Sequence, residues 1–218
     1  MKLTTVIFDI DGLLINSEPL WNQAAAEVFA SRNVYISEAE YATTTGLRTK
    51  EFVAWWLTHF QQDPAIFPEV EKEIVANVLD KIATNAATLP GVPYIFDFFA
   101  SRGFKIGLAT SSPPELIEIA KKITGIDNYV MAATSAESLP YGKPHPQVYL
   151  NCAAALQVAP INCVCFEDSF NGMVAAKAAR MKCVVVPHAS EQDHAKWGAA
   201  DAKLASLEHF TEEHLLKL

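Results

Sequence analysis

Two aspartates follow directly on a short apolar segment near the N-terminus, and this pattern constrains the fold more than any other. Residues 3–8 are all apolar or β-branched, and Asp9, Ile10, Asp11 and Gly12 come next. Such a run predicts a buried strand, which would deliver both carboxylates to the strand's carboxyl end, where open α/β sheets bind their ligands. The alternative is an ordinary turn, since Asp and Gly are frequent after strands. A turn does not explain Asp9, which lies at the very end of the buried segment.

Strands and helices alternate along most of the rest of the chain. Apolar runs predict further strands at residues 104–109, 129–132, 161–166, 181–186 and 202–204, with helices between them. This alternation predicts an α/β fold with a Rossmann-like parallel sheet flanked by helices. From about residue 43 to residue 89 the apolar residues recur only at helical spacing, and no convincing strand is found. This span therefore predicts an all-helical insertion.

Hydroxyl groups and one stiffened lysine follow two of the later strands. Thr110 and Ser111 end the predicted strand at 104–109, just before a helix. Hydroxyls and backbone N–H groups in this position form an anion site, or they simply cap the helix. Lys143 lies beside a glycine and two prolines, which restrict the backbone and so aim the lysine side chain.

A second pair of acids, Glu167 and Asp168, follows the predicted strand at 161–166. The carboxyl ends of parallel strands lie on one edge of a sheet, so this pair can converge with Asp9 and Asp11. Carboxylates clustered without His or Cys suit a hard cation, and Mg²⁺ held by acids and a substrate phosphate fits best. With a lysine and a hydroxyl nearby, one carboxylate of such a cluster can attack phosphorus.

The overall charge and composition narrow the range of partners. Seventeen basic and 25 acidic residues give a net charge of -8, which disfavours nucleic acid and anionic lipid as partners. No apolar run approaches the roughly 20 residues of a membrane span. None of the four cysteines belongs to a C-x-x-C pair. We therefore expect the cysteines to be small buried hydrophobic residues, and the protein to lie in the reducing cytoplasm.

Four motifs, in this order, resemble those of the haloacid dehalogenase superfamily of phosphohydrolases: Asp9-Ile10-Asp11-Gly12, Thr110, Lys143-Pro144 and Glu167-Asp168. The longer runs FDIDGLLINSEPLW, KPHPQVY and EDSFNGM resemble the bacterial hexitol and 2-deoxyglucose-6-phosphate phosphatases of the β-phosphoglucomutase-like branch. The resemblance implies an α/β core formed by residues 1–16 and 90–218, with a helical cap at 17–89 inserted after the first strand. It also implies a Mg²⁺-dependent phosphatase of small sugar or sugar-alcohol phosphates.

The resemblance gives roles to the motif residues of the core. Asp9 is similar to the nucleophile that forms an aspartyl-phosphate, and Asp11 to the acid that protonates the leaving oxygen and later activates water. Thr110 and the N–H of Ser111 would hold the phosphate, and Lys143 would neutralise it. The magnesium ligands implied are Asp9, the carbonyl of Asp11, and Asp168, with Glu167 as a further candidate.

Four residues of the expected cap are candidates for binding the leaving group. Gly46, Leu47 and Arg48 match the family's cap loop. From the residues alone, this loop either reaches an anionic or hydroxylated ligand through its arginine or is a solvated capping turn. Trp21 stands about where related phosphoglucomutases carry a histidine, which argues against a mutase. Asp11 argues against a dehalogenase, because dehalogenases of the superfamily lack this second acid.

Two other functions stay open at this point. A β-phosphoglucomutase-like phosphoryl transferase would make a bisphosphate intermediate, and a non-catalytic sugar-phosphate-binding module would bind its ligand without turnover. We expect a small phosphorylated sugar or polyol as the partner, and a monomer or weak homodimer as the assembly. The sequence leaves the identity of the sugar open.

Overall fold

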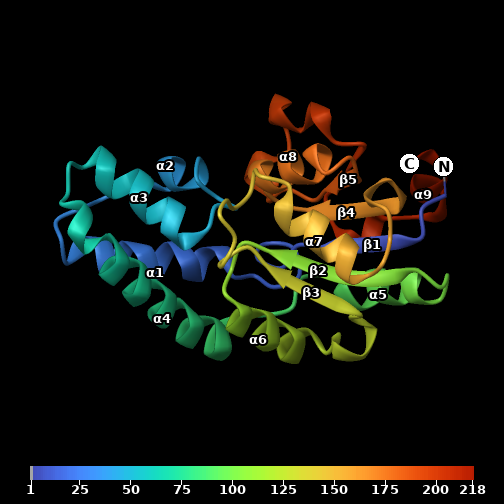
Figure 1. The fold of residues 1–218 in the computed structure, drawn as a ribbon, viewed down its shortest axis with the longest axis horizontal. Helices are drawn as coiled ribbons and strands as arrows, with labels where there is room; N and C mark the ends of the chain where they lie inside the picture. Colours follow the sequence, from blue (N-terminus) through green and yellow to red (C-terminus); the bar gives the residue numbers. More distant parts are fainter. Residues whose placement is uncertain (1) are drawn as a thin grey trace.

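A six-stranded parallel sheet organises the computed structural model, which describes residues 2–218 (Figure 1). The strands are β1 (Thr5–Phe8), β2 (Lys105–Thr110), β3 (Ala132–Ser135), β4 (Cys163–Glu167), β5 (Lys182–Val185) and β6 (Ala202–Lys203). Their order across the sheet is β3-β2-β1-β4-β5-β6, and every neighbouring pair is parallel. The predicted α/β fold is confirmed. The order reverses beside β1, so the carboxyl ends of β1 and β4 border the crevice where such sheets bind ligands.

Helices cover both faces of the sheet. The core on one face includes residues of α5 (Val92–Ala100), α6 (Pro114–Thr124) and α9 (Glu212–Lys217). The other core includes residues of α7 (Gln147–Ala155) and α8 (Phe170–Ala178). Side chains of β1 alternate between these cores, as a strand period of two requires: Phe8 lies in the first and Ile7 in the second. Phe8 also stacks on Phe96 of α5, with ring centroids 4.7 Å apart. Each fully buried side chain of this size contributes roughly 1.5–3 kcal/mol, so β1 is a rigid support for Asp9.

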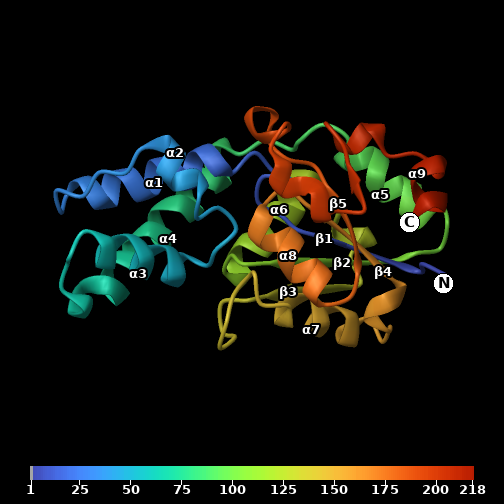
Figure 2. The ribbon, with the colours of Figure 1, turned by 90° about the horizontal axis from the view of Figure 1, so that it is seen from above.

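Four helices lie beyond the carboxyl ends of the strands, as both ribbon views show (Figures 1 and 2). They are α1 (Glu18–Ala30), α2 (Glu38–Ala42), α3 (Thr49–His59) and α4 (Phe67–Asn85), and we call residues 18–85 the helical cap. The cap has its own apolar core, in which Phe29 of α1 stacks on Phe52 of α3 with ring centroids 5.6 Å apart. None of the helices within residues 2–218 is long and apolar enough to cross a membrane.

The two segments that join the cap to the sheet run side by side. The N–H of Asn16 donates to the carbonyl of Ala87 at 2.9 Å, and the N–H of Leu89 donates to the carbonyl of Leu14 at 2.9 Å. Because both connections pass through one place, the cap is inserted into the core at a single point. We propose residues 16–17 and 89–90 as the boundaries, as expected from the sequence.

Strands β3 and β4 begin two or three residues later than the sequence pattern predicts, because a turn precedes each of them. The strand expected at 129–132 is β3, which begins only at Ala132, because residues 127–129 form a 3₁₀ turn. Tyr129 there packs its ring edge-on against Phe96 and donates a hydrogen bond to Asp97. The strand expected at 161–166 is β4, which follows another 3₁₀ turn at residues 160–162. Apolar side chains in both turns imitate the pattern of a strand.

Candidate active site

One cavity lies between the carboxyl edge of the sheet and the helical cap. Of the eleven residues that the sequence marks as site candidates, nine line it: Asp9, Asp11, Trp21, Gly46, Leu47, Thr110, Ser111, Lys143 and Asp168. Glu167 and Arg48 are not among the lining residues. Core and cap therefore both contribute to the site, in agreement with the convergence expected from the strand ends.

Lys143 is buried at the centre of a charged cluster. Its Nζ donates to Asp9 Oδ1 at 2.6 Å, to Glu167 Oε1 at 2.6 Å and to the carbonyl of Ala109 at 3.1 Å, so all three ammonium protons have acceptors. The lysine is only 1% exposed. Burial opposes its charge, but the two carboxylates raise its pKa above the ordinary value, and the side chain is a permanent cation.

Glu167 uses both of its carboxylate oxygens on protein donors. Besides Lys143, the hydroxyl of Tyr149 donates to Oε1, and the hydroxyl of Ser169 donates to Oε2 at 3.2 Å. Glu167 itself is fully buried. Its carboxylate is thus well placed to hold Lys143. Tyr149 and Ser169 were missed in the sequence, where they read as an ordinary helix residue and a helix cap.

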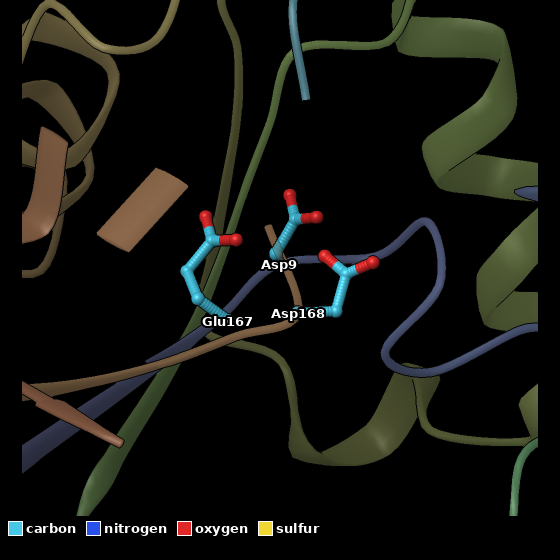
Figure 3. Close-up of side chains that lie close together, drawn as sticks. All are labelled: Asp9, Glu167 and Asp168. Carbon is cyan, nitrogen blue, oxygen red and sulfur yellow. The ribbon is translucent and has the colours of Figure 1, made fainter. Parts of the chain in front are cut away.

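Asp9, Glu167 and Asp168 gather their carboxylates at the ends of β1 and β4, as Figure 3 shows. One oxygen from each lies within 4.8 Å of the others. Asp168 Oδ1 is buried with no hydrogen-bond partner among the described residues. Burial, followed by the charge of neighbouring carboxylates, raises the pKa of Asp168. Burial also raises the pKa of Asp9, although Lys143 opposes this rise. Lys143 supplies one positive charge to this group of three carboxylates, and their oxygens fit an additional hard divalent cation such as Mg²⁺.

Gly12 allows Asp168 to approach β1 closely. Its φ is +69°, in the left-handed region, and a Cβ atom there would lie 2.1 Å from Asp168 Oδ2. Any side chain at this position would displace the carboxylate. A turn alone could explain a glycine at position 12, but the close approach of Asp168 requires one there.

Asp11 has four neutral hydrogen-bond donors. Oδ1 accepts from Ser17 Oγ at 2.7 Å and Trp21 Nε1 at 2.8 Å, both from the start of the cap. Oδ2 accepts from Ser112 Oγ at 2.6 Å, in the loop after β2, and more weakly from Thr110 Oγ1 at 3.4 Å, at the end of β2. Asp11 thus joins cap to core. Ser17 and Ser112 were not predicted as site residues, because a serine just before a helix is typical of a helix cap.

The loop after β2 also contacts the cap directly. Ser111 Oγ donates to the carbonyl of Gly46 at 2.8 Å, and Asn171 at the start of α8 donates to the carbonyl of Thr45 at 2.9 Å. These bonds hold the cap loop at residues 45–47 over the carboxyl edge of the sheet. The backbone of this loop is therefore fixed, while Leu47 lines the cavity.

The cap wall of the cavity holds polar groups that were not singled out in the sequence. Glu18, Tyr41, Thr44 and Thr45 line it together with Trp21. Burial, and then the charge of Asp11, raises the pKa of Glu18 to about 8. The mixture of hydroxyls, one carboxyl and aromatic faces suits a polyhydroxylated ligand. In the sequence, Glu18 is typical of the acids that favour the first turn of a helix, so it was not predicted as a site residue.

Arg48 points to a different place from the one expected. Its side chain is buried, and its guanidinium donates to backbone carbonyls after β3, including that of Ala136 at 3.0 Å. The expected contact between Arg48 and the leaving group stays a prediction without support from the cavity lining. The sequence carries no signal for this arrangement, because its acceptors are backbone atoms.

The chain belongs to the haloacid dehalogenase-like hydrolases: that family matches residues 3–180, a span that contains every element of the charged cluster. Relatives within the family that align over nearly the whole chain are phosphatases, so the protein is a hydrolase of the phosphatase class. Hexitol phosphatase B of Escherichia coli (strain K12) is 41% identical over 216 residues, which cover 99% of this chain and 97% of that protein. Protein CbbY of Rhodobacter capsulatus is 29% identical, covering 97% and 99% of the two chains.

Solved structures share the fold across both core and cap. A CbbY variant from Rhodobacter sphaeroides, in complex with xylulose-(1,5)bisphosphate, superimposes with a TM-score of 0.86 at 25% identity, covering 98% of this chain and 99% of that one. β-Phosphoglucomutase from Clostridium difficile gives a TM-score of 0.86 at 21% identity, covering 99% and 96%. At that identity the mutase shows the shared fold alone.

Proposed function

We propose that the protein is a Mg²⁺-dependent phosphatase of small sugar or sugar-alcohol monophosphates that works through an aspartyl-phosphate on Asp9. The observation that carries the proposal is the pairing of Asp9 with buried Lys143 in the lining of a cavity whose cap side includes several polar residues. The 41% identity to a hexitol phosphatase supports the substrate class.

Asp9 has one oxygen held and one free. Lys143 holds Oδ1, while Oδ2 has no hydrogen bond to any described residue and is available to attack phosphorus. The lysine also keeps the attacking carboxylate oriented and neutralises part of the charge that gathers in the transition state. Attack forms the Asp9 oxygen–phosphorus bond and breaks the bond from phosphorus to the sugar oxygen. Water then attacks the phosphorus of the aspartyl-phosphate and releases inorganic phosphate.

Asp11 is the proposed acid and base. It gives a proton to the leaving sugar oxygen and later takes one from the attacking water. Its four neutral donors fix the carboxyl group beside Asp9. Thr110 and the N–H of Ser111 are the proposed donors to phosphate oxygens.

Asp9 and Asp168 are the proposed side-chain ligands of Mg²⁺. Asp168 has the orphaned oxygen, and both carboxylates are desolvated. A bound Mg²⁺ would supply positive charge to these acids and to the substrate phosphate. Asp11 can offer only its carbonyl, because its carboxylate is occupied. Glu167 is the weaker candidate, since its oxygens already accept from Lys143, Tyr149 and Ser169.

The mutase alternative is less well supported. Trp21 stands about where the resemblance places the mutase histidine, and its indole N–H serves as a donor to Asp11. An indole has no basic nitrogen with which to take up a proton. We therefore expect release of inorganic phosphate and no bisphosphate intermediate.

The test is phosphate release from a panel of hexose, deoxyhexose and hexitol monophosphates, with Mg²⁺ and with EDTA. We expect turnover of at least one member that EDTA abolishes and Mg²⁺ restores, and loss of at least about 10⁴-fold in kcat for Asp9→Asn. Full activity of Asp9→Asn would overturn the mechanism. Tight binding of panel members without turnover would instead favour the non-catalytic module.

A further inference from the structure

We propose that Arg48 and Glu51 of the helical cap are positioning residues for Lys143, so that placement of the lysine depends on contact between cap and core. The pair acts on the loop that leads into Lys143 and does not touch the reacting atoms. The proposal rests on the role given to Lys143 under the proposed function. It replaces substrate contact as the reason for an arginine in the cap loop.

The guanidinium of Arg48 binds the chain between β3 and Lys143. Nη1 donates to the carbonyls of Ala136 at 3.0 Å and Leu139 at 2.5 Å, and a weaker contact of Nη2 reaches the carbonyl of Pro140 at 3.4 Å. Arg48 is 6% exposed and is separated from these residues by about 90 positions in the chain. Its Nη1 and Nη2 atoms therefore donate to the core loop and to Glu51, Nε is buried with no hydrogen-bond partner among the described residues, and Arg48 does not line the cavity.

Glu51, in the first turn of α3, also binds this loop. Its Oε1 accepts from Arg48 Nη2 at 2.6 Å and from the N–H of Gly142 at 3.0 Å. Burial opposes the charge of Glu51, but the hydrogen bonds from Arg48 and Gly142 lower its pKa below the ordinary value, so the pair is ionised at neutral pH. Gly142 directly precedes Lys143, so the carboxylate holds the backbone next to the lysine.

Gly142 packs directly against this ion pair. A Cβ atom at Gly142 would lie 2.5 Å from Glu51 Oε2 and 2.7 Å from Arg48 Nε. A side chain at this position would have to displace Arg48 or Glu51 from the loop. The glycine beside Lys143 is therefore explained by close approach to the cap.

The loop has few other constraints of its own. Residues 136–146 form no helix or strand, and residues 137, 138, 140 and 141 are exposed. Lys143 Nζ, by contrast, must reach three acceptors at 2.6–3.1 Å in a closed interior. A misplacement of about 1 Å in a catalytic group can cost on the order of 100-fold in rate. The Arg48–Glu51 pair therefore holds the loop in the position that Lys143 needs to reach these acceptors.

Amide hydrogen exchange of the full-length protein tests the grip without requiring activity. We expect amides within residues 136–145 to exchange at least about tenfold faster in Arg48→Met than in wild type. Arg32→Met is the matched control, because Arg32 binds Glu73 at 3.0 Å and the carbonyl of Val28, all within the cap. The control should leave this segment unchanged. Equal exchange in Arg48→Met and wild type would overturn the proposal.

Steady-state kinetics test the consequence for Lys143. With a monophosphate that the wild type hydrolyses, we expect Arg48→Met to lower kcat at least about tenfold and to change KM less than about threefold. A rise in KM with unchanged kcat would instead show direct contact with substrate and overturn the proposal. An unchanged kcat with a lower Tm in both arginine variants would show a structural role only, and would also overturn it.

If Arg48→Met does not fold, the same two measurements can be made on Glu51→Gln. Its amide oxygen can still accept from Gly142, so we expect a smaller loss in kcat and a smaller rise in exchange at 136–145; values equal to wild type in both measurements would contradict the proposal. If the wild-type protein releases no phosphate from any substrate, the proposed function fails. The exchange experiment still decides whether the pair holds the loop.

Discussion

The two aspartates that end β1 lie one residue apart and are held in opposite ways. Asp9 is bound by a buried cation and faces two other acids, and every member of this group comes from the core. Asp11 is bound by neutral hydroxyl and indole donors, two of which come from the start of the cap. The half of the site that holds the proposed nucleophile is thus built from charge within the core. The half that holds the proposed acid and base is built from hydrogen bonds, two of which need the start of the cap in place.

This difference predicts which changes cost most. Removing one partner of a buried ion pair leaves an uncompensated charge, which is far more costly than losing one neutral hydrogen bond. Changes in the Asp9 cluster should therefore alter both activity and stability strongly. Changes around Asp11 should be milder.

The largest effect is expected for Lys143→Met. Its loss leaves Asp9 and Glu167 facing each other without a cation, so we expect kcat to fall by about 10³-fold and the free energy of unfolding by about 3 kcal/mol. Lys217→Met is the control, because Lys217 is 73% exposed and its pair with Glu213 is solvated. Urea unfolding and initial rates measure both quantities. A kcat within tenfold of wild type would remove the cation from the mechanism.

Asp168→Asn should separate metal binding from folding. The variant removes the charge of a half-buried carboxylate whose Oδ1 is buried with no hydrogen-bond partner among the described residues, so in EDTA we expect its free energy of unfolding to be about 1–2 kcal/mol higher than that of the wild type. Mg²⁺ should raise the Tm of the wild type by ligand linkage and leave that of the variant nearly unchanged. Thermal unfolding with a Mg²⁺ titration measures this. Equal stabilisation of both proteins by Mg²⁺ would place the metal elsewhere.

Trp21→Phe tests the cap's share in holding Asp11. It keeps the aromatic packing and removes one donor to the carboxylate, so we expect kcat to fall by roughly tenfold, with stability changed by less than about 1 kcal/mol. Trp55→Phe is the matched control, because Trp55 of α3 is 62% exposed and does not line the cavity. Equal kcat values for Trp21→Phe and Trp55→Phe would show that the hydrogen bond from Trp21 to Asp11 does not contribute to catalysis.

The smallest effect is expected for Ser112→Ala, which removes one core donor to Asp11 Oδ2. Thr110 can still donate to the same oxygen, so we expect a fall in kcat of about threefold and little change in the free energy of unfolding. A larger loss than for Trp21→Phe would show that the core, and not the cap, controls Asp11. Rates for the two single variants and the double variant decide this.

The sequence was informative where chemistry depends on residue type at a strand end. Asp9 and Asp168 lie at the ends of segments whose composition predicts a strand, and parallel strands must bring such ends to one edge; Lys143 was marked instead by the glycine and prolines beside it. The same reasoning placed β3 and β4 too early, because apolar residues in two 3₁₀ turns continue the strand pattern. It also left Ser17, Ser112 and Ser169 out of the predicted site, although each contacts a site carboxylate.

The sequence by itself determined the family, the parallel α/β core and the members of the charged cluster, because these follow from local residue patterns and their order. Only the tertiary structure decided how the partners are shared: Glu167 holds Lys143, Asp168 keeps an orphaned oxygen, and neutral donors surround Asp11. Arg48 is the clearest case. Its acceptors are backbone carbonyls far away in the chain, every residue has such a carbonyl, and only the packing of cap on core selects among them.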